Sequence, residues 1–249
     1  TGEWSREVEI QESPVEPDGH NYPSLLIDDE GYLHVLHTFH GNHEILYAKS
    51  TSPRSIDEWE VSYLEGTEAA TYGAAYEAKN GDFYLMVRMR LDYDPHDVDY
   101  EPEFILKSTD RGQTWEKTKI IDPAPIEDHY GTIYTKGIHY ESGSRAIAGN
   151  KMTSEGLHIA FGIHQYHNTY SNEHFFAFYS FEDNHLYGVD GQDYGTSLEK
   201  SEMTGNVKVF DLGGAQDFYN VRMGLNLDGQ GNPTMFWNQK DSEGTNQLR

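Results

Sequence analysis

Glycines followed by alternating apolar and polar positions recur along this chain and give its dominant pattern. Such segments begin at Gly31, Gly81, Gly156 and Gly231, at spacings of 50, 75 and 75 residues. An alternation with a period of two is typical of a β-strand, and a glycine in front of it is typical of a hairpin turn. Each glycine therefore marks a predicted turn between two antiparallel strands. Further strands are predicted at 44–50, 103–108 and 174–180.

The same repeats decide the predicted fold class. No segment shows a sustained helical period, and no long Pro- or Ser-rich linker divides the chain. Repeating units of about 50 residues with four short strands are typical of a β-propeller. We therefore predict an all-β chain in which residues 1–249 form a single β-propeller domain of four-stranded antiparallel blades, about four to five in number. The segment 238–249 resembles the start of another strand, so we expect the domain to be incomplete at its C-terminal end.

The segment 108–115 matches a turn motif, the Asp-box, at every defined position of S-x-D-x-G-x-T-W. In this motif Asp110 accepts hydrogen bonds from backbone N–H groups and Gly112 takes a positive φ. Trp115 is expected to pack between blades. A weaker version of the motif ends the first repeat at 50–59. The motif supports a propeller, but it is structural and indicates no reaction.

The charge of the chain limits its partners. Its 249 residues include 18 Lys and Arg against 42 Asp and Glu, a net charge of −24. Nucleic acid would be repelled, because phosphate binding requires clustered Lys and Arg. Such an acidic surface is typical of a marine or halophilic protein, and an anionic substrate would need a local positive site. The chain has no Cys, which excludes disulfides and thiol catalysis.

Hydropathy gives no sign of a membrane segment. No run of about 18 apolar residues is present, so we expect no transmembrane helix. Residues 1–10 do not read as a signal peptide, although they could be the mature end left after one was removed. We expect the protein to be a monomer.

Four reactive side chains lie in two stretches that share one layout. In each stretch a Tyr precedes the turn glycine by nine residues. The first stretch carries His20 and His40, and the second carries Tyr72 and Arg88. Two imidazoles, a phenol and a guanidinium could together remove a proton beside a carboxylate and protonate a leaving oxygen.

Residues 18–60 and 70–117 resemble the opening repeats of BNR-repeat polysaccharide lyases, in particular bacterial ulvan lyases. Those enzymes are secreted by marine bacteria and cleave ulvan, a sulfated rhamnose–uronic acid polymer, by β-elimination. The resemblance implies a catalytic set of two His and a Tyr–Arg pair. Here these correspond to His20 and His40, twenty residues apart, and to Tyr72 and Arg88, sixteen apart.

Two departures from that family stand out. The resemblance implies a seven-bladed propeller, for which 249 residues are too few. Some members also hold a structural metal ion partly through Cys, which this chain lacks. Because of the first departure, the resemblance does not imply a complete substrate cleft in this chain. Because of the second, it does not imply the family's metal site.

Cleavage of a uronic acid polymer by elimination requires three tasks. Arg suits the neutralisation of the carboxylate, because its planar fork matches that group and stays charged. A neutral His suits removal of the C5 proton. Tyr suits protonation of the oxygen that leaves C4, and beside an Arg it can also ionise and act as a base. Which of His20, His40 and Tyr72 is the base and which the acid stays open.

Each of these residues also has a structural interpretation. His20 could be a surface-loop residue, His40 a strand-end residue bonded to a carbonyl, and Tyr72 an architectural residue. A buried Arg88 needs an anion, which an Asp or Glu of the protein could supply. Arg90 shares the strand face of Arg88 by alternation and is its rival. Substrate contacts are expected at Asn21, Arg90, His129 and His164.

The reaction requires no cofactor, but two kinds of segment leave room for a structural calcium or zinc ion. The segment 156–174 is rich in His, with His158 and His164 on one strand face and His167 and His174 nearby, yet it matches no tight zinc signature. The acidic segments 28–30 and 92–103 lack the defined loop of an EF-hand. Solvated loops are the ordinary interpretation of the His-rich and the acidic segments, and the sequence does not identify a metal.

Two other functions fit parts of the sequence. A sialidase-type glycoside hydrolase shares the Asp-box and would need three Arg on its substrate carboxylate, for which Arg88, Arg145 and Arg222 are candidates. The early Arg motif of those enzymes is missing. A non-catalytic carbohydrate-binding propeller would need none of the reactive residues. We favour a lyase that acts on an anionic polysaccharide outside the cell, whether secreted, periplasmic or at the cell surface.

Overall fold

The computed structural model describes most of the chain as strands and turns. The described residues are 6–16, 21, 23–40, 43–94, 97–123, 131–134, 150–153, 155–165, 173–211, 223–240 and 246–248. They form two compact units, Thr1–Val87 with Leu106–Glu116 and Arg88–Ile105 with Lys117–Arg249. Apart from the 3₁₀ turn Lys200–Glu202, every regular element in the described part is a strand. The predicted all-β class is therefore confirmed, and none of the described helices has the length and apolar character of a membrane span.

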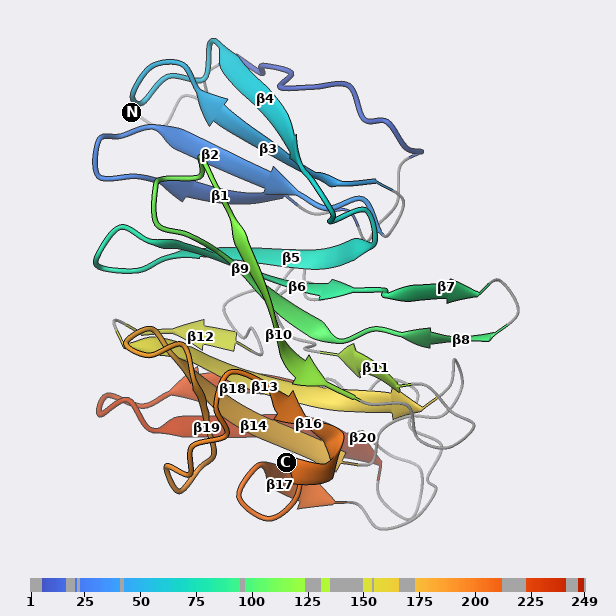
Figure 1. Cartoon of the computed structure of the whole chain (residues 1–249). Helices are drawn as coiled ribbons and strands as arrows, with labels where there is room; N and C mark the ends of the chain where they lie inside the picture. Colours follow the sequence, from blue (N-terminus) through green and yellow to red (C-terminus); the bar gives the residue numbers. More distant parts are fainter. Residues whose placement is uncertain are drawn as a thin grey trace. The chain divides into compact units, whose positions relative to one another are not determined.

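The first sheet is an antiparallel meander in the order β1-β2-β3-β4 (Figure 1). Its strands are β1 (Pro23–Ile27), β2 (Leu33–His37), β3 (Ile45–Ser50) and β4 (Trp59–Leu64). Buried and half-buried residues alternate along β2, whereas all but one residue of β3 are buried. Phe39, Leu46 and Ala48 form a buried cluster. This sheet confirms the predicted four-stranded antiparallel unit.

The second sheet has the strand order β16-β10-β9-β6-β5. The strands are β5 (Ala70–Glu77), β6 (Phe83–Met89), β9 (Glu103–Ser108), β10 (Glu116–Asp122) and β16 (Leu198–Glu199). β16 joins β10 in parallel, which departs from the predicted purely antiparallel unit. All seven residues of β6 are buried, so this strand is covered on both faces and not on one alternating face. A short hairpin, β7 (Asp92–Asp94) and β8 (Asp97–Tyr100), follows β6.

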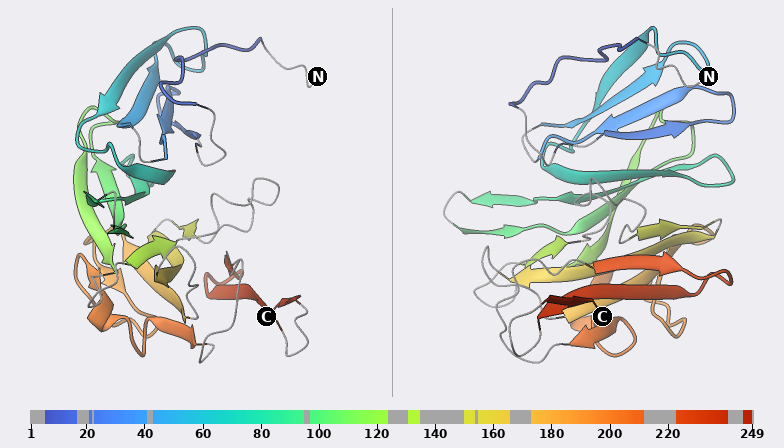
Figure 2. Two further views of the ribbon diagram at one scale, coloured as in Figure 1. Left: turned by 90° about the vertical axis from the view of Figure 1, so that its right-hand side faces the viewer. Right: turned by 180° about the vertical axis from the view of Figure 1, so that it is seen from behind.

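Two further sheets belong to the second unit (Figure 2). One contains β11 (Gly131–Tyr134), β12 (Asn150–Met152), β13 (Gly156–Gln165), β14 (Glu173–Ser180), β15 (Leu186–Tyr187) and β17 (Lys208–Asp211). The other contains β18 (Met223–Leu227), β19 (Pro233–Lys240) and β20 (Asn246–Leu248). Ala160, Phe176 and Leu225 bury one another where these two sheets meet. Among the described residues the sheets thus range from two to six strands, so the predicted count of four is not uniform.

Three of the four predicted turn glycines lie in the hairpin turns that the pattern indicated. Gly31, Gly81 and Gly231 have φ values of +91°, +86° and +87°, which favour glycine. The N–H of each donates to the carbonyl three residues earlier. Gly156 differs, because it begins β13, and an added Cβ would lie 2.1 Å from the carbonyl oxygen of Tyr179. A close approach of the neighbouring strand, and not a turn, therefore requires glycine at 156.

The segment 108–115 forms a tight turn within the first unit. Asp110 accepts hydrogen bonds from the N–H of Thr114 and the hydroxyl of Ser108, at 2.9 and 2.8 Å. Gly112 has a φ of +84°, and an added Cβ would meet the Tyr47 hydroxyl at 2.0 Å. The ring of Trp115 meets the ring of Tyr47 edge-on, with centroids 6.0 Å apart. The turn is thus packed against β3 of the first sheet.

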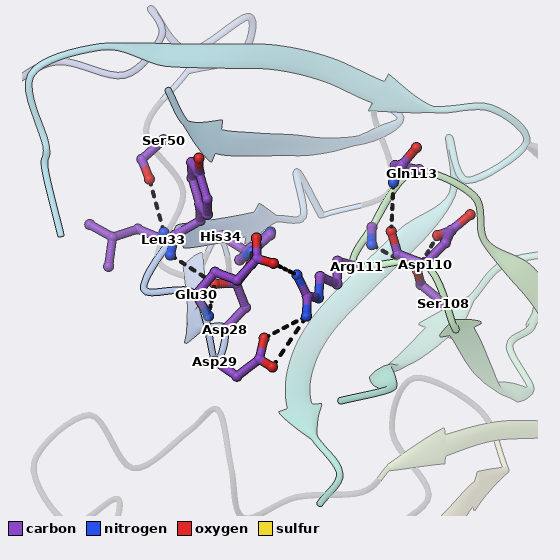
Figure 3. Close-up of polar contacts among 12 residues, drawn as sticks. Asp28, Asp29, Glu30, Leu33, His34, Ser50, Ser108, Asp110, Arg111 and Gln113 are labelled. Atoms are coloured by element: carbon purple, nitrogen blue, oxygen red, sulfur yellow. Dashed lines mark hydrogen bonds and ion pairs between the residues drawn. The ribbon is translucent and has the colours of Figure 1, made fainter. Parts of the chain in front are cut away.

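A chain of polar contacts, buried at His34 and partly exposed at Arg111, connects this turn with the first sheet (Figure 3). The ring of His34, fully buried on β2, has Nε2 3.1 Å from Asp28 and Nδ1 2.7 Å from the Tyr47 hydroxyl. The Tyr47 hydroxyl also lies 3.2 Å from the carbonyl oxygen of Arg111. The Arg111 guanidinium pairs with Asp29, 2.8 Å away, and with Glu30. Burial lowers the pKa of His34 although Asp28 opposes this, so we assign a neutral ring that donates to Asp28 and accepts from Tyr47.

Buried imidazoles should make the fold sensitive to mild acid. Burial lowers the pKa of His34 and His158, and it lowers that of fully buried His174 to about 4. A folded-state pKa below the ordinary value means that the unfolded chain binds more protons, so stability is complete above about 6.5 and falls as the pH drops towards 4. The contribution of His174 at the acid end is roughly 3 kcal/mol.

Thermal unfolding between neutral pH and pH 4 measures this loss. We expect the melting temperature to fall steadily below about pH 6.5 and the slope to flatten in His174→Gln. Replacement of His185 is the control, because the contact with Asp193 raises the pKa of His185. The contribution of His185 to stability is therefore lost as the pH rises, and not as it falls. An unchanged melting temperature across this range would contradict the buried neutral histidines.

Candidate active site

The structure describes some of the predicted site residues and not others. Tyr72 and His40 lie in the first unit, and Arg88 and Arg90 lie in the second. His20 and His129 lie outside the described residues, and so do Arg145, Arg222 and His167. The backbone of His164 is part of β13, but its side chain is not described. Asn21 is described and half-buried.

His40 and Tyr72 come together in the first unit. Their ring centroids are 6.1 Å apart, and the ring planes are inclined by 50°. The Tyr72 side chain is buried with 6% exposure, whereas His40 is half-buried. The pair therefore joins the phenol of a β5 residue and the imidazole of a residue shortly after β2, 32 positions apart in the sequence.

Both residues have an unusual backbone conformation. The φ angle is +52° at His40 and +56° at Tyr72, in the left-handed region that residues with a Cβ rarely adopt. Such a conformation costs of the order of 1 kcal/mol or more and persists only where the surrounding structure enforces it. Strained residues of this kind cluster at functional sites. Two adjacent rings that both carry this strain are therefore the strongest structural sign of a site in the first unit.

Tight packing between β1, β2 and β5 enforces this arrangement. Gly73 follows Tyr72, and an added Cβ there would lie 2.9 Å from the Thr38 methyl group. Thr38 is two residues before His40, so the strand ends that carry the two rings meet at Gly73. The hydroxyl of Ser24 donates to the carbonyl of Gly73 at 3.0 Å and joins β1 to β5. A larger residue at 73 would press against Thr38, so one of the two segments would have to shift.

Three polar atoms on the same segments are buried without a hydrogen-bond partner among the described residues. They are Asn21 Oδ1, His37 Nε2 and Thr38 Oγ1. Buried polar groups are normally satisfied, so such atoms need a water or a ligand. Burial also lowers the pKa of His37, which favours its neutral form. Asn21 was predicted to contact substrate, and its unsatisfied oxygen is consistent with that role.

In the second unit, one carboxylate holds two arginines. Arg88 Nε lies 3.1 Å from Glu101 Oε2, and Arg90 Nη2 lies 3.0 Å from Glu101 Oε1. Arg90 also donates to Oε1 through Nε at 3.2 Å. The side chains of Arg88 and Glu101 are 6% and 5% exposed, whereas that of Arg90 is 32% exposed. The buried Arg88 thus has a protein carboxylate as a partner, the alternative that the sequence left open.

Glu101 is a residue that the sequence analysis missed. It lies in the acidic segment 92–103, which was interpreted as a solvated loop or a calcium site. That interpretation is wrong for Glu101 and Glu103, which are 4% and 1% exposed. The signal that could have identified Glu101 is the apolar strand around Arg88, because a buried guanidinium requires an anion nearby.

The structure gives no support to a metal site within its described part. No group of three or more His, Cys, Asp or Glu side chains in the described ranges could hold a metal ion. In the segment 28–30, Asp28 binds His34, and Asp29 and Glu30 bind Arg111. These carboxylates thus already have partners among the side chains of the protein.

Comparison with known families places this chain among carbohydrate-active relatives. Residues 2–248 match the family described as BNR repeat-containing family members, so the chain belongs to that family. An ulvan lyase of Alteromonas sp. (strain LOR) is 24% identical over 238 residues, which covers 87% of this chain and 46% of that protein. An ulvan lyase of Pseudoalteromonas sp. (strain PLSV) is 29% identical over 136 residues, covering 46% of this chain and 26% of the relative.

A solved structure agrees in fold. The PL25 ulvan lyase bound to -[GlcA(1-4)Rha3S]- superposes with a TM-score of 0.69 at 18% identity. The match covers 96% of this chain and 57% of that structure. The chain therefore spans about half the length of the relatives that it matches.

Proposed function

We propose that this protein is a polysaccharide lyase that cleaves ulvan by β-elimination at the uronic acid. The observation that carries the proposal is the strained His40–Tyr72 pair, which brings an acid–base couple together. The names of the relatives support the substrate, and so does the glucuronate–rhamnose sulfate ligand in the solved lyase. We place its action outside the cell, because the proposed substrate is an extracellular polymer, and we expect it to act as a monomer.

The proposal includes a β-propeller in which the sheets are blades. The meander order β1-β2-β3-β4 is the strand order of a propeller blade. The turn at 108–115 has the hydrogen bonds expected of an Asp-box, and the likeness to the solved lyase supports the same fold.

The four candidate residues are arranged symmetrically about two hairpin turns. In the first hairpin, paired residues have numbers that add up to 60, as for Pro23 and His37. His20 and His40 each lie ten residues from Glu30, the centre of that turn. Tyr72 and Arg88 each lie eight residues from position 80, the centre of the turn that contains Gly81. Each pair thus lies at matching sequence distances from the turn of its own hairpin, and this shared layout is the sequence feature on which the choice of the four residues rests.

The chemistry assigns one task to each side chain. Arg88 would neutralise the uronate carboxylate and so make the C5 proton more acidic. A base removes that proton, the electron pair forms the C4–C5 double bond, and the C4–O4 bond breaks. Tyr72 would protonate the leaving oxygen O4.

The stereochemistry of the sugar explains why more than one base is useful. In a glucuronate the C5 proton and O4 lie on the same face, so Tyr72 could take a proton and return one. In an iduronate they lie on opposite faces, so His20 or His40 would act from the other side. A site with both kinds of group would accept both epimers.

The masses of the oligosaccharide products test the proposed reaction. Elimination places a C4–C5 double bond at each new non-reducing end, and a fragment with such an end is lighter by one water than the same fragment from hydrolysis. We expect digestion of ulvan to yield the lighter series for all fragments except those from the original non-reducing ends, as measured by mass spectrometry. A series that carries the added water would show a glycoside hydrolase, and intact polymer with measurable binding would show a carbohydrate-binding protein.

A further inference from the structure

We infer that Glu101 is a positioning residue of the reaction, which fixes the Arg88 guanidinium for the uronate carboxylate. This inference rests on the proposed function, since it concerns how the arginine of that site is held. Glu101 contacts substrate in no step and acts through Arg88.

The geometry of the cluster supports this role. Glu101 meets Arg88 at Nε, 3.1 Å away, and both side chains are almost fully buried. A contact at Nε sets the plane and direction of the guanidinium, and a carboxylate ligand is bound in that plane. The backbone holds Glu101 in place, because the N–H of Met89, next to Arg88, donates to the carbonyl of Pro102 at 3.0 Å. The position of Arg88 is thus determined by both a side-chain and a main-chain contact between the same two segments.

The charge balance of the cluster also fits an anionic substrate. Glu101 carries one negative charge and contacts two guanidinium groups, Arg88 and Arg90. These three groups keep a net charge of +1, in a chain whose net charge is −24. An isolated buried pair of guanidinium groups would repel each other, and a second carboxylate would cancel the remaining charge. One shared carboxylate therefore permits both arginines to stay close.

The partial exposure of Arg90 distinguishes the two arginines. Its side chain is 32% exposed, whereas that of Arg88 is 6% exposed. Glu101 binds Arg90 through two nitrogens, so the same carboxylate also orients the more accessible guanidinium. A change at Glu101 should therefore disturb the binding geometry of both.

Kinetics of Glu101→Gln on ulvan test the inference. The amide keeps the size of the side chain and removes its charge, so the two guanidinium groups lose their common anchor. We expect kcat to fall on the order of 10- to 100-fold, with KM changed much less, because a guanidinium displaced by a fraction of an ångström still attracts the polymer. Circular dichroism at the assay temperature verifies that the variant is folded.

Two further variants separate positioning from stability. Glu101→Asp keeps the charge and shortens the reach, so it should fold like the wild type and lose part of kcat. Asp82→Asn removes a carboxylate from another half-buried pair, with Lys107 at 3.4 Å, and should leave kcat unchanged. A wild-type kcat in a folded Glu101→Gln protein would overturn the inference and leave the proposed function intact. If the amide variant does not fold, a wild-type kcat in Glu101→Asp would do the same. Absence of an unsaturated product from the wild-type protein itself would overturn the proposed function, and this inference with it.

Discussion

Replacement of Tyr72 by Phe should lower the rate of ulvan cleavage by about 10³-fold or more, while the affinity for the polymer stays nearly that of the wild type. The substitution removes only the hydroxyl, because Phe retains the buried ring beside His40. The unusual φ of +56° costs Phe and Tyr about the same, so the backbone should not change. The hydroxyl is the proton donor to the leaving oxygen, and its loss therefore affects the chemical step and not binding. Initial rates and equilibrium binding of ulvan measure the two effects separately.

Tyr76→Phe is the matched control for this variant. Tyr76 lies on the same strand, β5, and its replacement also removes one phenolic hydroxyl. We expect this control to retain most of the activity. A Tyr72→Phe protein with full activity would overturn the mechanism and leave Tyr72 as an architectural residue.

Replacement of Arg88 by Ala should lower turnover on the order of 10²- to 10³-fold. Without the guanidinium, the carboxylate charge would oppose the negative charge that develops at C5. Ala also removes one of the two cations that Glu101 contacts, so we expect some loss of thermal stability. Rates must therefore be measured well below the melting temperature of the variant.

Arg88→Lys and Arg90→Ala show which property of Arg88 matters. Lys keeps the charge but lacks the planar fork, so it should recover only a small part of the lost rate. Arg90→Ala should act mainly on KM, because Arg90 is the more exposed guanidinium. A larger loss of kcat in Arg90→Ala than in Arg88→Ala would transfer the role to Arg90.

Local periodicity was sufficient to predict several of the strands and three of the turns. Alternation around Gly31 and the positive φ that it needs are local properties, and the neighbouring strands confirm them. The parallel attachment of β16 to β10 was not predictable, because it joins Ile121 and Leu198 across 77 positions without a local signal. The role of Gly156 was missed for a related reason, since it depends on the approach of Tyr179.

For the candidate site, the sequence was informative about residue types and less so about their partners. His40 and Tyr72 were chosen from a shared layout and a family resemblance, and the structure brings their rings together. Their positive φ angles and the close packing at Gly73 depend on tertiary structure, which no periodicity could indicate. Glu101 was hidden in an acidic segment, because the burial of a carboxylate depends on the strands around it.

The ultraviolet absorbance of ulvan during incubation with the purified protein tests the central claim most directly. A C4–C5 double bond conjugated with the uronate carboxylate absorbs where the intact polymer does not. The account predicts an absorbance that rises with time and enzyme concentration and that is almost absent with Tyr72→Phe. New reducing ends without any rise in absorbance would contradict it, because they would show that the polymer is cut by hydrolysis.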